Sequence, residues 1–383
     1  MEKSIGRSKR CPTCSSIIES SSTDHDSSPS SLQSPAGNIF SRPSYDIVFF
    51  MSFLHRVGVL DISKDGMDLV KLYKIKIYTD SRRLEDDESR VMKIRPFWKG
   101  LRPAFSSFAA LDRDFYCLGG QSSPGPAFVP YAYVLTNSRP YCWVPLPHMN
   151  FPRIEPPCLV LDGNVYVLSG HFGVPFGSDD SASTHRGDLE VYRPRDGRWD
   201  VLPDPPIPLG YHFMYAALEN PSRILVAVLT APNEGHEAVF CVYDVKLGNW
   251  ELLDNPERQL HGMCPRGLGG KALSVGNTLY WITDNDHMLL AYLLDLDKWL
   301  LGDLGCLDLS IFGYREWNPP ILLHLQDQRF CMVQSAPGNL VHCVILDVLH
   351  KPIQNMLEIS VVSVEKFKVE DIAPIEHCFL LGK

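Results

Sequence analysis

The sequence has no apolar run long enough to cross a lipid bilayer. The most apolar early window, residues 47–60, includes His55 and Arg56 and is shorter than the roughly 20 residues that a membrane helix needs. The opening residues, MEKSIGRSKR, contain no apolar segment of the kind found in a secretory signal. We therefore expect neither a transmembrane helix nor a secretory signal.

Basic residues are fewer than acidic ones. Lys and Arg number 36 against 45 Asp and Glu, which gives a formal net charge of −9. Proteins that bind nucleic acid or anionic lipid through charge need a basic surface. We therefore expect no nucleic-acid partner and no membrane partner.

The 11 cysteines lack the short, regular spacing of a disulfide scaffold, and their number is odd. Most lie inside apolar runs, such as Cys117 in FYCLGG and Cys343 in VHCVIL. Reduced, buried thiols that pack as small apolar side chains explain this placement best. Such thiols predict a cytoplasmic or nuclear location, to which Arg7, Lys9 and Arg10 add only a weak nuclear signal.

Sustained helical spacing of apolar residues is almost absent. Residues 1–44 are rich in serine and poor in apolar residues, so we predict a disordered tail there. Over residues 45–383, short apolar runs alternate with Asp-Gly, Gly-Asn and Pro, and residues 79–93 form a polar interruption. This pattern is typical of an all-β domain.

What the sequence does contain is a repeat. Tryptophans recur about every 50 residues, as in repeat architectures, at Trp98, Trp143, Trp199, Trp250 and Trp299. Tyr192, Tyr243 and Tyr292 each precede the next of these tryptophans by seven positions, with a turn-like segment between. Another hairpin lies upstream, such as CLVLDGNVYVLSG over residues 158–170. Each unit is therefore predicted to contain four strands joined up and down.

Four-stranded units that pack around an axis bury both of their faces, which is the β-propeller arrangement. We expect a single six-bladed β-propeller of four-stranded antiparallel blades over residues 45–383, with a unit over 319–362 that lacks the tryptophan. Residues 56–75 are expected to supply two strands of the last blade, and residues 373–383 its first strands. Such a shared blade closes the ring without a free edge.

The repeat resembles the kelch family. Residues 142–199 carry the pattern best, with Trp143, LPHM, an arginine, a glycine-containing hairpin, and then Tyr192 and Trp199. The double glycine of the family is kept at Gly119 and Gly120 and reduced to Gly170 in the next unit. The chain is similar overall to plant kelch and F-box/kelch proteins, and the resemblance implies the fold far more than a function.

Loop lengths predict which end of the propeller binds a partner. Turns between strands 1 and 2 and between strands 3 and 4 are short, whereas the 2–3 loops and the connections between blades, which lie at the other end, are long. Long loops on a rigid scaffold usually carry binding. The predicted partner-binding residues are His171, Phe172, Arg186, Tyr211, His212, His236, Arg266, His287 and Arg315.

Patterns for catalysis or metal binding are few. Cys11 and Cys14 make half of a zinc site without a matching pair, and residues 284–287 form a polar turn. No Gly-x-Ser-x-Gly motif occurs. Neither the copper set of galactose oxidase nor the Glu, Asp and His iron set of plant specifier proteins is present as a motif. We expect no catalytic residue, no metal and no cofactor.

These features favour a non-catalytic protein–protein interaction module. One alternative is a substrate-recognition component of an SCF-type ubiquitin ligase, because plant kelch domains often follow an F-box, although residues 1–44 lack the Leu-Pro opening of that motif. Another alternative is a propeller enzyme that binds a metal or a small molecule at the axis. The expected partner is another protein, such as a ubiquitin-ligase component or substrate.

Overall fold

The structure, a computed structural model, describes most of the chain beyond its first 42 residues. It covers residues 43–53, 67–79, 91–121, 129–136, 141–170, 187–209, 213–229, 238–253, 270–282, 288–305, 320–371 and 373–381. Regular structure in these ranges is β-strand, apart from one short 3-10 helix, η3 (Pro352–Gln354). No helix in these ranges is long and apolar enough to cross a membrane.

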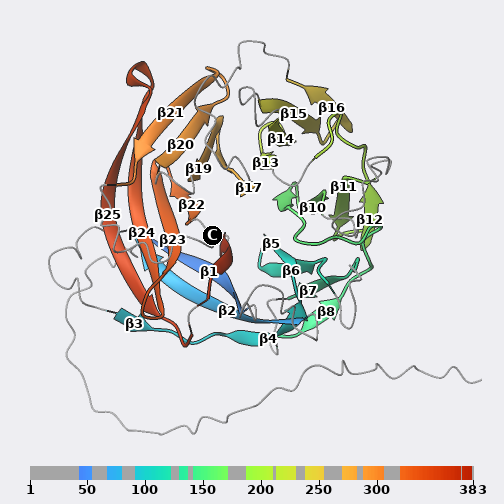
Figure 1. Cartoon of the computed structure of the whole chain (residues 1–383), viewed down its shortest axis with the longest axis horizontal. Coiled ribbons are helices and arrows are strands. Elements are labelled where there is room, and N and C mark those ends of the chain that lie inside the picture. The colour runs from blue at the N-terminus through green and yellow to red at the C-terminus, as the bar shows by residue number, and fades with distance from the viewer. Residues whose placement is uncertain are drawn as a thin grey trace, which may run out of the picture. The chain divides into compact units, whose positions relative to one another are not determined.

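The strands form antiparallel four-stranded groups that surround a common centre (Figure 1). Each group is named from its innermost strand outward. The first group joins the two ends of the chain and consists of β26 (Ile375–Leu380), β1 (Ser44–Phe53), β2 (Met67–Tyr78) and β4 (Trp98–Pro103). The second consists of β5 (Ser107–Leu111), β6 (Asp114–Leu118), β7 (Ala132–Leu135) and β8 (Trp143–Pro145).

The next two groups follow in chain order. The third consists of β9 (Cys158–Leu161), β10 (Asn164–Leu168), β11 (Leu189–Arg193) and β12 (Arg198–Val201). The fourth consists of β13 (Phe213–Leu218), β14 (Arg223–Leu229), β15 (Ala238–Asp244) and β16 (Asn249–Leu252). The short strand β17 (Gly270–Lys271) adds to β13 in parallel, on its inner side.

The last two groups belong to one nine-stranded sheet. The fifth consists of β18 (Leu273–Val275), β19 (Thr278–Ile282), β20 (Met288–Leu293) and β21 (Lys298–Asp303). The sixth consists of β22 (Ile321–Gln326), β23 (Arg329–Ala336), β24 (Leu340–Lys351) and β25 (Met356–Lys368). A single parallel bridge between Leu301 and Met356 joins them, and β3 (Val91–Lys93) pairs with the far end of β25.

The apolar core is divided into clusters that lie between successive groups. In β1, Ile47 and Phe49 pack against the sixth group, whereas Val48 and Phe50 pack against the second. Further clusters join the second group to the third, the third to the fourth, the fourth to the fifth and the fifth to the sixth. Inner strands are therefore apolar on both faces, as strands buried from both sides must be.

The predicted register of the tyrosine and tryptophan repeat is confirmed. Tyr192 pairs directly with Trp199, and their rings lie 5.2 Å apart. Tyr243 and Trp250 pair in the same way at 5.3 Å, and so do Tyr292 and Trp299 at 4.6 Å. A seven-residue spacing across a four-residue turn places the two rings side by side on one face of the hairpin, where such cross-strand pairs stabilise a sheet.

Three of the tryptophans, Trp143, Trp199 and Trp250, also contact the preceding group. Trp199 Nε1 donates a hydrogen bond to the carbonyl of Pro147 at 2.9 Å, and Trp250 Nε1 donates to Pro203 at 2.7 Å. Both prolines stand four positions after the tryptophan of their own group. At the equivalent position after Trp98, the guanidinium of Arg102 lies 4.6 Å from the Trp143 ring. The repeat thus links neighbouring groups as well as strands.

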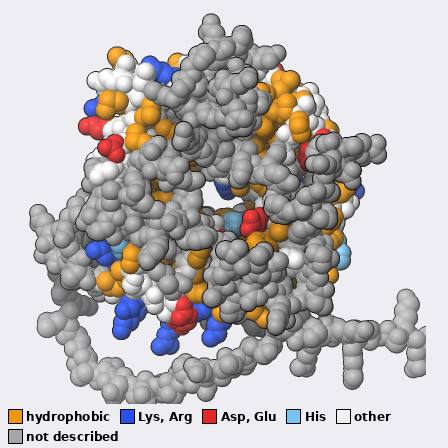
Figure 2. Space-filling view, viewed as in Figure 1, with side chains coloured by type: hydrophobic (Ala, Val, Ile, Leu, Met, Phe, Trp, Pro, Cys, Tyr) orange, Lys and Arg blue, Asp and Glu red, His pale blue; other side chains and the backbone are white. Residues whose placement is uncertain are grey.

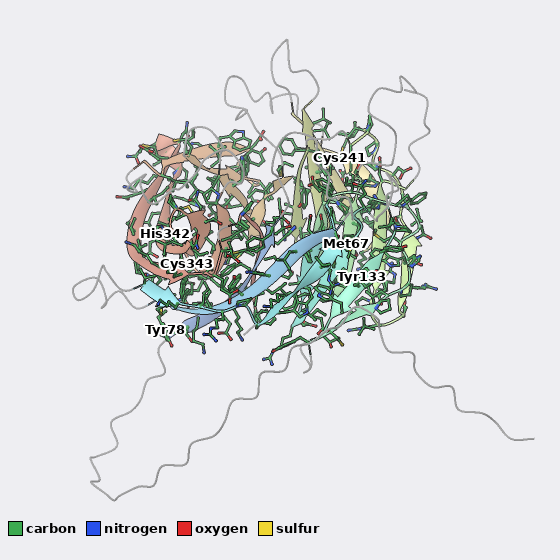
Figure 3. The ribbon with its side chains drawn as sticks, turned by 60° about the horizontal axis from the view of Figure 1, so that its bottom comes forward. Met67, Tyr78, Tyr133, Cys241, His342 and Cys343 are labelled. Atoms are coloured by element: carbon green, nitrogen blue, oxygen red, sulfur yellow. The ribbon has the colours of Figure 1, made fainter. Side chains whose placement is uncertain are left out.

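The shared first group divides its strands differently from the prediction. β1 begins at Ser44, within the tail predicted to be disordered, and residues 54–66, which include most of the expected first strand, lie outside the described residues. Three strands come from the N-terminal side, and residues 373–383 supply one strand rather than several. β2 runs from Met67 to Tyr78 (Figure 3), and the Tyr78 backbone amide donates to Glu365 Oε1 of β25 at 3.2 Å.

Candidate functional site: the central cavity

The innermost strands enclose a cavity of about 620 Å³. β26, β5, β9, β13, β18 and β22 each contribute residues to its wall, so all six groups meet there. Figure 2 shows the opening at the centre of the domain, with basic, acidic and histidine side chains at it. The volume lies within the range of small-molecule sites, which are concave and mostly apolar with a few polar groups.

The wall of the cavity is largely apolar and aromatic. Phe108, Phe213, Leu273, Trp281 and Leu323 belong to it, together with prolines of the connections. Polar side chains interrupt this lining at a few places, notably Cys158, Tyr215, Lys271, Glu376 and His377. These groups carry the chemistry of the cavity.

Cys158 and Tyr215 lie on neighbouring strands of the wall, β9 and β13. The Cys158 thiol donates to the Pro156 carbonyl at 3.0 Å, and burial raises its pKa to about 12, against the opposing charges of Arg153 and Lys271. Burial also raises the pKa of Tyr215, which has a hydrogen bond with the Cys158 backbone. Both groups therefore stay protonated and neutral at physiological pH.

Lys271 is the basic residue of the cavity wall. The parallel pairing of Tyr215 with Lys271, and the hydrogen bond from the Ala272 amide to the Tyr215 carbonyl at 2.8 Å, fix its backbone. Water reaches its side chain from the cavity. Nevertheless, the surrounding protein removes much of the solvation of the ammonium group, which lowers the pKa of Lys271.

His377 lies on β26, and its ring makes an edge contact with Phe108 of β5 at 5.4 Å. Burial and, to a smaller extent, the positive charge of Lys271 together lower the pKa of His377 to about 3. The imidazole is therefore neutral at physiological pH and accepts or donates hydrogen bonds as an uncharged ring.

Carboxylates also line the cavity, at Asp68, Glu155 and Glu376. Among the described residues, no cluster of three or more His, Cys, Asp or Glu side chains has the geometry to hold a metal ion. The seven described cysteines are all free, and six of them are buried.

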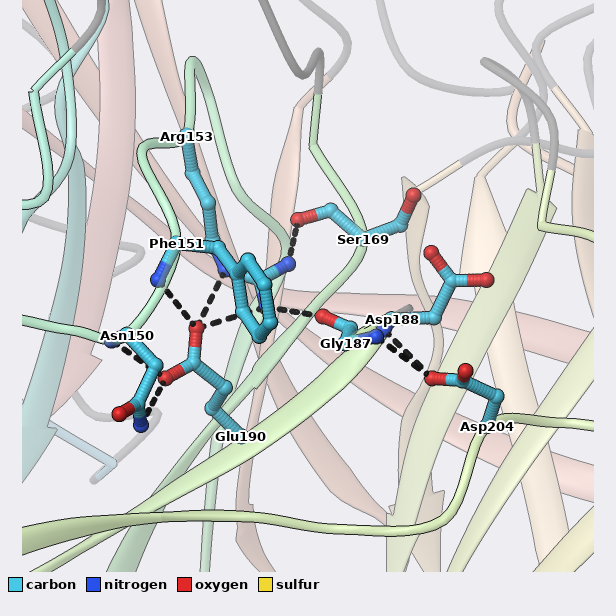
Figure 4. A network of polar contacts seen from close by, with 8 residues as sticks. All are labelled: Asn150, Phe151, Arg153, Ser169, Gly187, Asp188, Glu190 and Asp204. Atoms are coloured by element: carbon cyan, nitrogen blue, oxygen red, sulfur yellow. Dashed lines mark hydrogen bonds and ion pairs between the residues drawn. The ribbon is translucent and has the colours of Figure 1, made fainter. Parts of the chain in front are cut away.

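The connection between β8 and β9 contains a buried ion pair (Figure 4). Residues 155–158 of this connection and of β9 line the cavity. Arg153 Nη2 donates to Glu190 Oε1 at 2.9 Å, and both side chains are completely buried. The Asn150 backbone amide donates to the other oxygen of Glu190 at 2.7 Å. Arg153 also donates to the carbonyls of Ser169 and Gly187. The guanidinium of Arg153 and the carboxylate of Glu190 therefore each have several hydrogen-bond partners.

The glycines of the repeat make room for this connection. A Cβ atom on Gly119 would lie 2.6 Å from the Arg153 carbonyl oxygen, and the Gly120 amide donates to that same oxygen at 2.8 Å. Both glycines have positive φ, at 70° and 103°, which side chains disfavour. Gly170, with φ of 114°, packs against Arg153 from the next group. The predicted double glycine is thus a close-approach site.

The predicted partner-binding residues all lie outside the described part of the chain. These are His171, Phe172, Arg186, Tyr211, His212, His236, Arg266, His287 and Arg315. Cys11, Cys14 and residues 284–287 lie outside it as well. The structural repeat residues Gly119, Gly120, Trp143, Gly170, Tyr192, Trp199, Tyr243, Trp250, Tyr292 and Trp299 are all described.

Sequence reasoning missed the residues of the cavity itself. Lys271 follows three glycines in Gly267-Leu-Gly-Gly-Lys271, a run that the sequence offers only as a poor phosphate-loop candidate. His377 and Glu376 lie in a strand whose role becomes clear only when it pairs with β1.

The chain matches no protein-family model. A comparison with curated proteins gives no match either. The resemblance to kelch repeats therefore stays a prediction from the sequence.

Proposed function

We propose that residues 45–383 form a single, closed, six-bladed β-propeller of the kelch type that acts as a non-catalytic protein-interaction module. The observation that supports the closed ring best is the division of the apolar core. Six clusters each join one four-stranded group to the next, and the cluster around Phe49 and Val333 joins the last group to the first.

Contacts around the axis support the same count. The innermost strands neighbour one another in the order β5, β9, β13, β18, β22 and β26. The ring contact between His377 and Phe108 links β26 back to β5. The pairing of β26 with β1 then joins the N-terminal and C-terminal strands in one blade and covers the inner edge of β1.

The pairing pattern supports a binding face at one end of the ring. Residues 112–113, 162–163, 276–277 and 327–328 are short turns between the first and second strands. Residues 169–188, 202–212 and 304–320 are longer connections that leave from the opposite strand ends. The nine predicted partner-binding residues belong to such connections, and they include the arginines and aromatic residues that usually anchor an interface.

Proximity labelling with the full chain tests this face. Arg266→Ala and Arg315→Ala should each lower partner recovery about thirtyfold or more, since an arginine at the centre of an interface contributes about 2 kcal/mol or more. The matched control is Arg113→Ala, because Arg113 is exposed in the short turn over 112–113 at the other end. Equal recovery with all three variants would contradict the proposed face. Recovery of ubiquitin-ligase scaffold subunits would favour the ligase alternative.

A further inference from the structure

The wall of the central cavity includes a primary amine, that of Lys271. The backbone of Lys271 pairs with β13. β17 adds a short parallel strand inside β13, and this places Lys271 in the wall beside Tyr215. Ala272, the next residue, is buried and hydrogen-bonded to Tyr215. In the described part of the chain, the short strand pairs only with β13, and both of its residues belong to the cavity wall.

Lys271 has no counter-ion in the described part of the chain. No carboxylate there lies within ion-pair distance of its Nζ, although Glu155 and Glu376 line the same cavity. Lys71 offers the contrast: it pairs with Glu370 at 3.2 Å and Asp371 at 2.5 Å, and these bonds raise its pKa despite burial. For Lys271, loss of solvation to the surrounding protein outweighs any attraction and the pKa is lowered, although water reaches the side chain from the cavity.

Two neighbouring side chains, His377 and Cys158, carry no negative charge that would favour the protonated form of Lys271. His377 is neutral, and the positive charge of Lys271 disfavours its protonation. The Cys158 thiol is neutral as well, because burial raises its pKa to about 12. Lysines desolvated in apolar pockets are the ones that act as nucleophiles toward carbonyl compounds, because the free base carries the lone pair that attacks.

The remaining wall indicates the kind of molecule that fits. Phe108, Phe213, Tyr215 and Trp281 surround the cavity with aromatic rings, and the volume of about 620 Å³ admits a small organic molecule. We propose that Lys271 is a covalent attachment site for a small, apolar aldehyde, which it holds in the central cavity as an imine. This site requires the cavity but no protein partner.

The attachment step balances without an oxidant or a reductant. The Lys271 nitrogen lone pair forms a bond to the carbonyl carbon, and the π electrons of the carbonyl move to its oxygen. A proton passes from nitrogen to that oxygen, and the resulting carbinolamine loses water to give the imine. Amine and aldehyde thus give imine and one water, and hydrolysis reverses the step.

Reductive trapping tests the proposal on the wild-type full chain. Benzaldehyde with cyanoborohydride at pH 7 converts each imine into a stable benzylamine, which peptide mass spectrometry assigns to a residue. Lys99 and Lys246 are exposed and serve as internal controls. Lys271 should react faster than either, since its lowered pKa leaves a larger fraction of the amine as free base at pH 7.

Two further measurements sharpen the result. Glyceraldehyde, a polar aldehyde, should show a smaller preference for Lys271 than benzaldehyde, because it shares the free-base advantage but gains little from the aromatic wall. Lys271→Arg should abolish the fast labelling while Lys99 and Lys246 react as before. Labelling of Lys271 no faster than the two exposed lysines would overturn the proposal, and that comparison needs no variant to fold. An equal preference for glyceraldehyde would overturn the apolar selectivity.

Discussion

Arg153 and Glu190 form an ion pair in which neither side chain is exposed to solvent, although they lie 37 positions apart in the sequence. Arg153 comes from the connection between β8 and β9, and Glu190 lies on β11. The pair therefore joins the path into one four-stranded group to the third strand of that group. A buried pair of this kind is costly to break on one side only, because the remaining charge is left without a partner.

Glu190→Ala should therefore lower the free energy of unfolding by about 3–5 kcal/mol. Urea denaturation followed by tryptophan fluorescence measures the change. Asp200→Asn is the matched control, because the Arg193–Asp200 pair is partly exposed and should contribute only about 0–1 kcal/mol. The double variant Arg153→Met with Glu190→Leu should be more stable than Glu190→Ala. Equal losses for Glu190→Ala and Asp200→Asn would show that the buried pair contributes no more than the exposed one.

The tryptophan repeat gives a graded prediction. Trp199 is 9% exposed, so Trp199→Ala should cost about 3–5 kcal/mol of unfolding free energy. Trp250 is more exposed, and Trp250→Ala should cost less. Trp199→Phe keeps the ring against Tyr192 but removes the hydrogen bond to Pro147, for a loss near 1 kcal/mol from that bond. Thermal unfolding of the three variants gives the order, and a larger loss at Trp250 than at Trp199 would refute it.

Closure of the first sheet by β26 makes the end of the chain essential for stability. Removal of residues 375–383 exposes the inner edge of β1 and takes Ile375 and Cys378 out of the apolar cluster around Phe49. The truncated chain should lose its cooperative unfolding transition in circular dichroism and become sensitive to limited proteolysis. Removal of residues 382–383 alone is the control, and a cooperative transition in both truncated chains would show that β26 is dispensable.

The stability of the domain should decrease in mild acid because of His377. Burial and the charge of Lys271 hold its pKa at about 3, below the ordinary value of 6.5. Since the unfolded chain binds a proton that the native imidazole refuses, the unfolding free energy should fall as the pH drops from 6.5 toward 3. His377→Gln should reduce the difference in unfolding free energy between pH 7 and pH 4.5.

Lys271→Met provides the complementary measurement. It removes a positive charge that lowers the pKa of His377, so the histidine should titrate at a higher pH in this variant. Proton NMR of the imidazole resonances follows the titration directly. An unchanged midpoint would mean that burial alone sets the pKa.

The features that the sequence could reveal are the local ones. A turn of four residues between Tyr192 and Trp199 fixes their register, so the spacing alone predicts that they pair. The double glycine at Gly119 and Gly120 can be recognised in the sequence because both positions have positive φ, which disfavours most other residues. The all-β class and the four-stranded groups follow from many such local patterns.

The features that escaped prediction depend on contacts between distant residues. The first strand was expected after residue 55, whereas β1 covers Ser44–Phe53. The run SYDIVFFMSF lacks the alternation of apolar and polar residues that identifies a strand exposed on one face. Lys271 could not be placed at the axis, since this position follows from its pairing with Tyr215, more than 50 residues earlier. The low pKa of His377 likewise depends on its contact with β5 and on Lys271.

The union of β26 with β1 also governs how the protein is made on the ribosome. β1, β2 and β4 are synthesised early, but β26, which covers the inner edge of β1, emerges only after all the other described strands. Until β26 emerges, the inner edge of β1 is uncovered and can pair with strands of other nascent chains. Emergence of β26 is therefore the moment at which this sheet first completes itself, and chaperone protection is needed most before it.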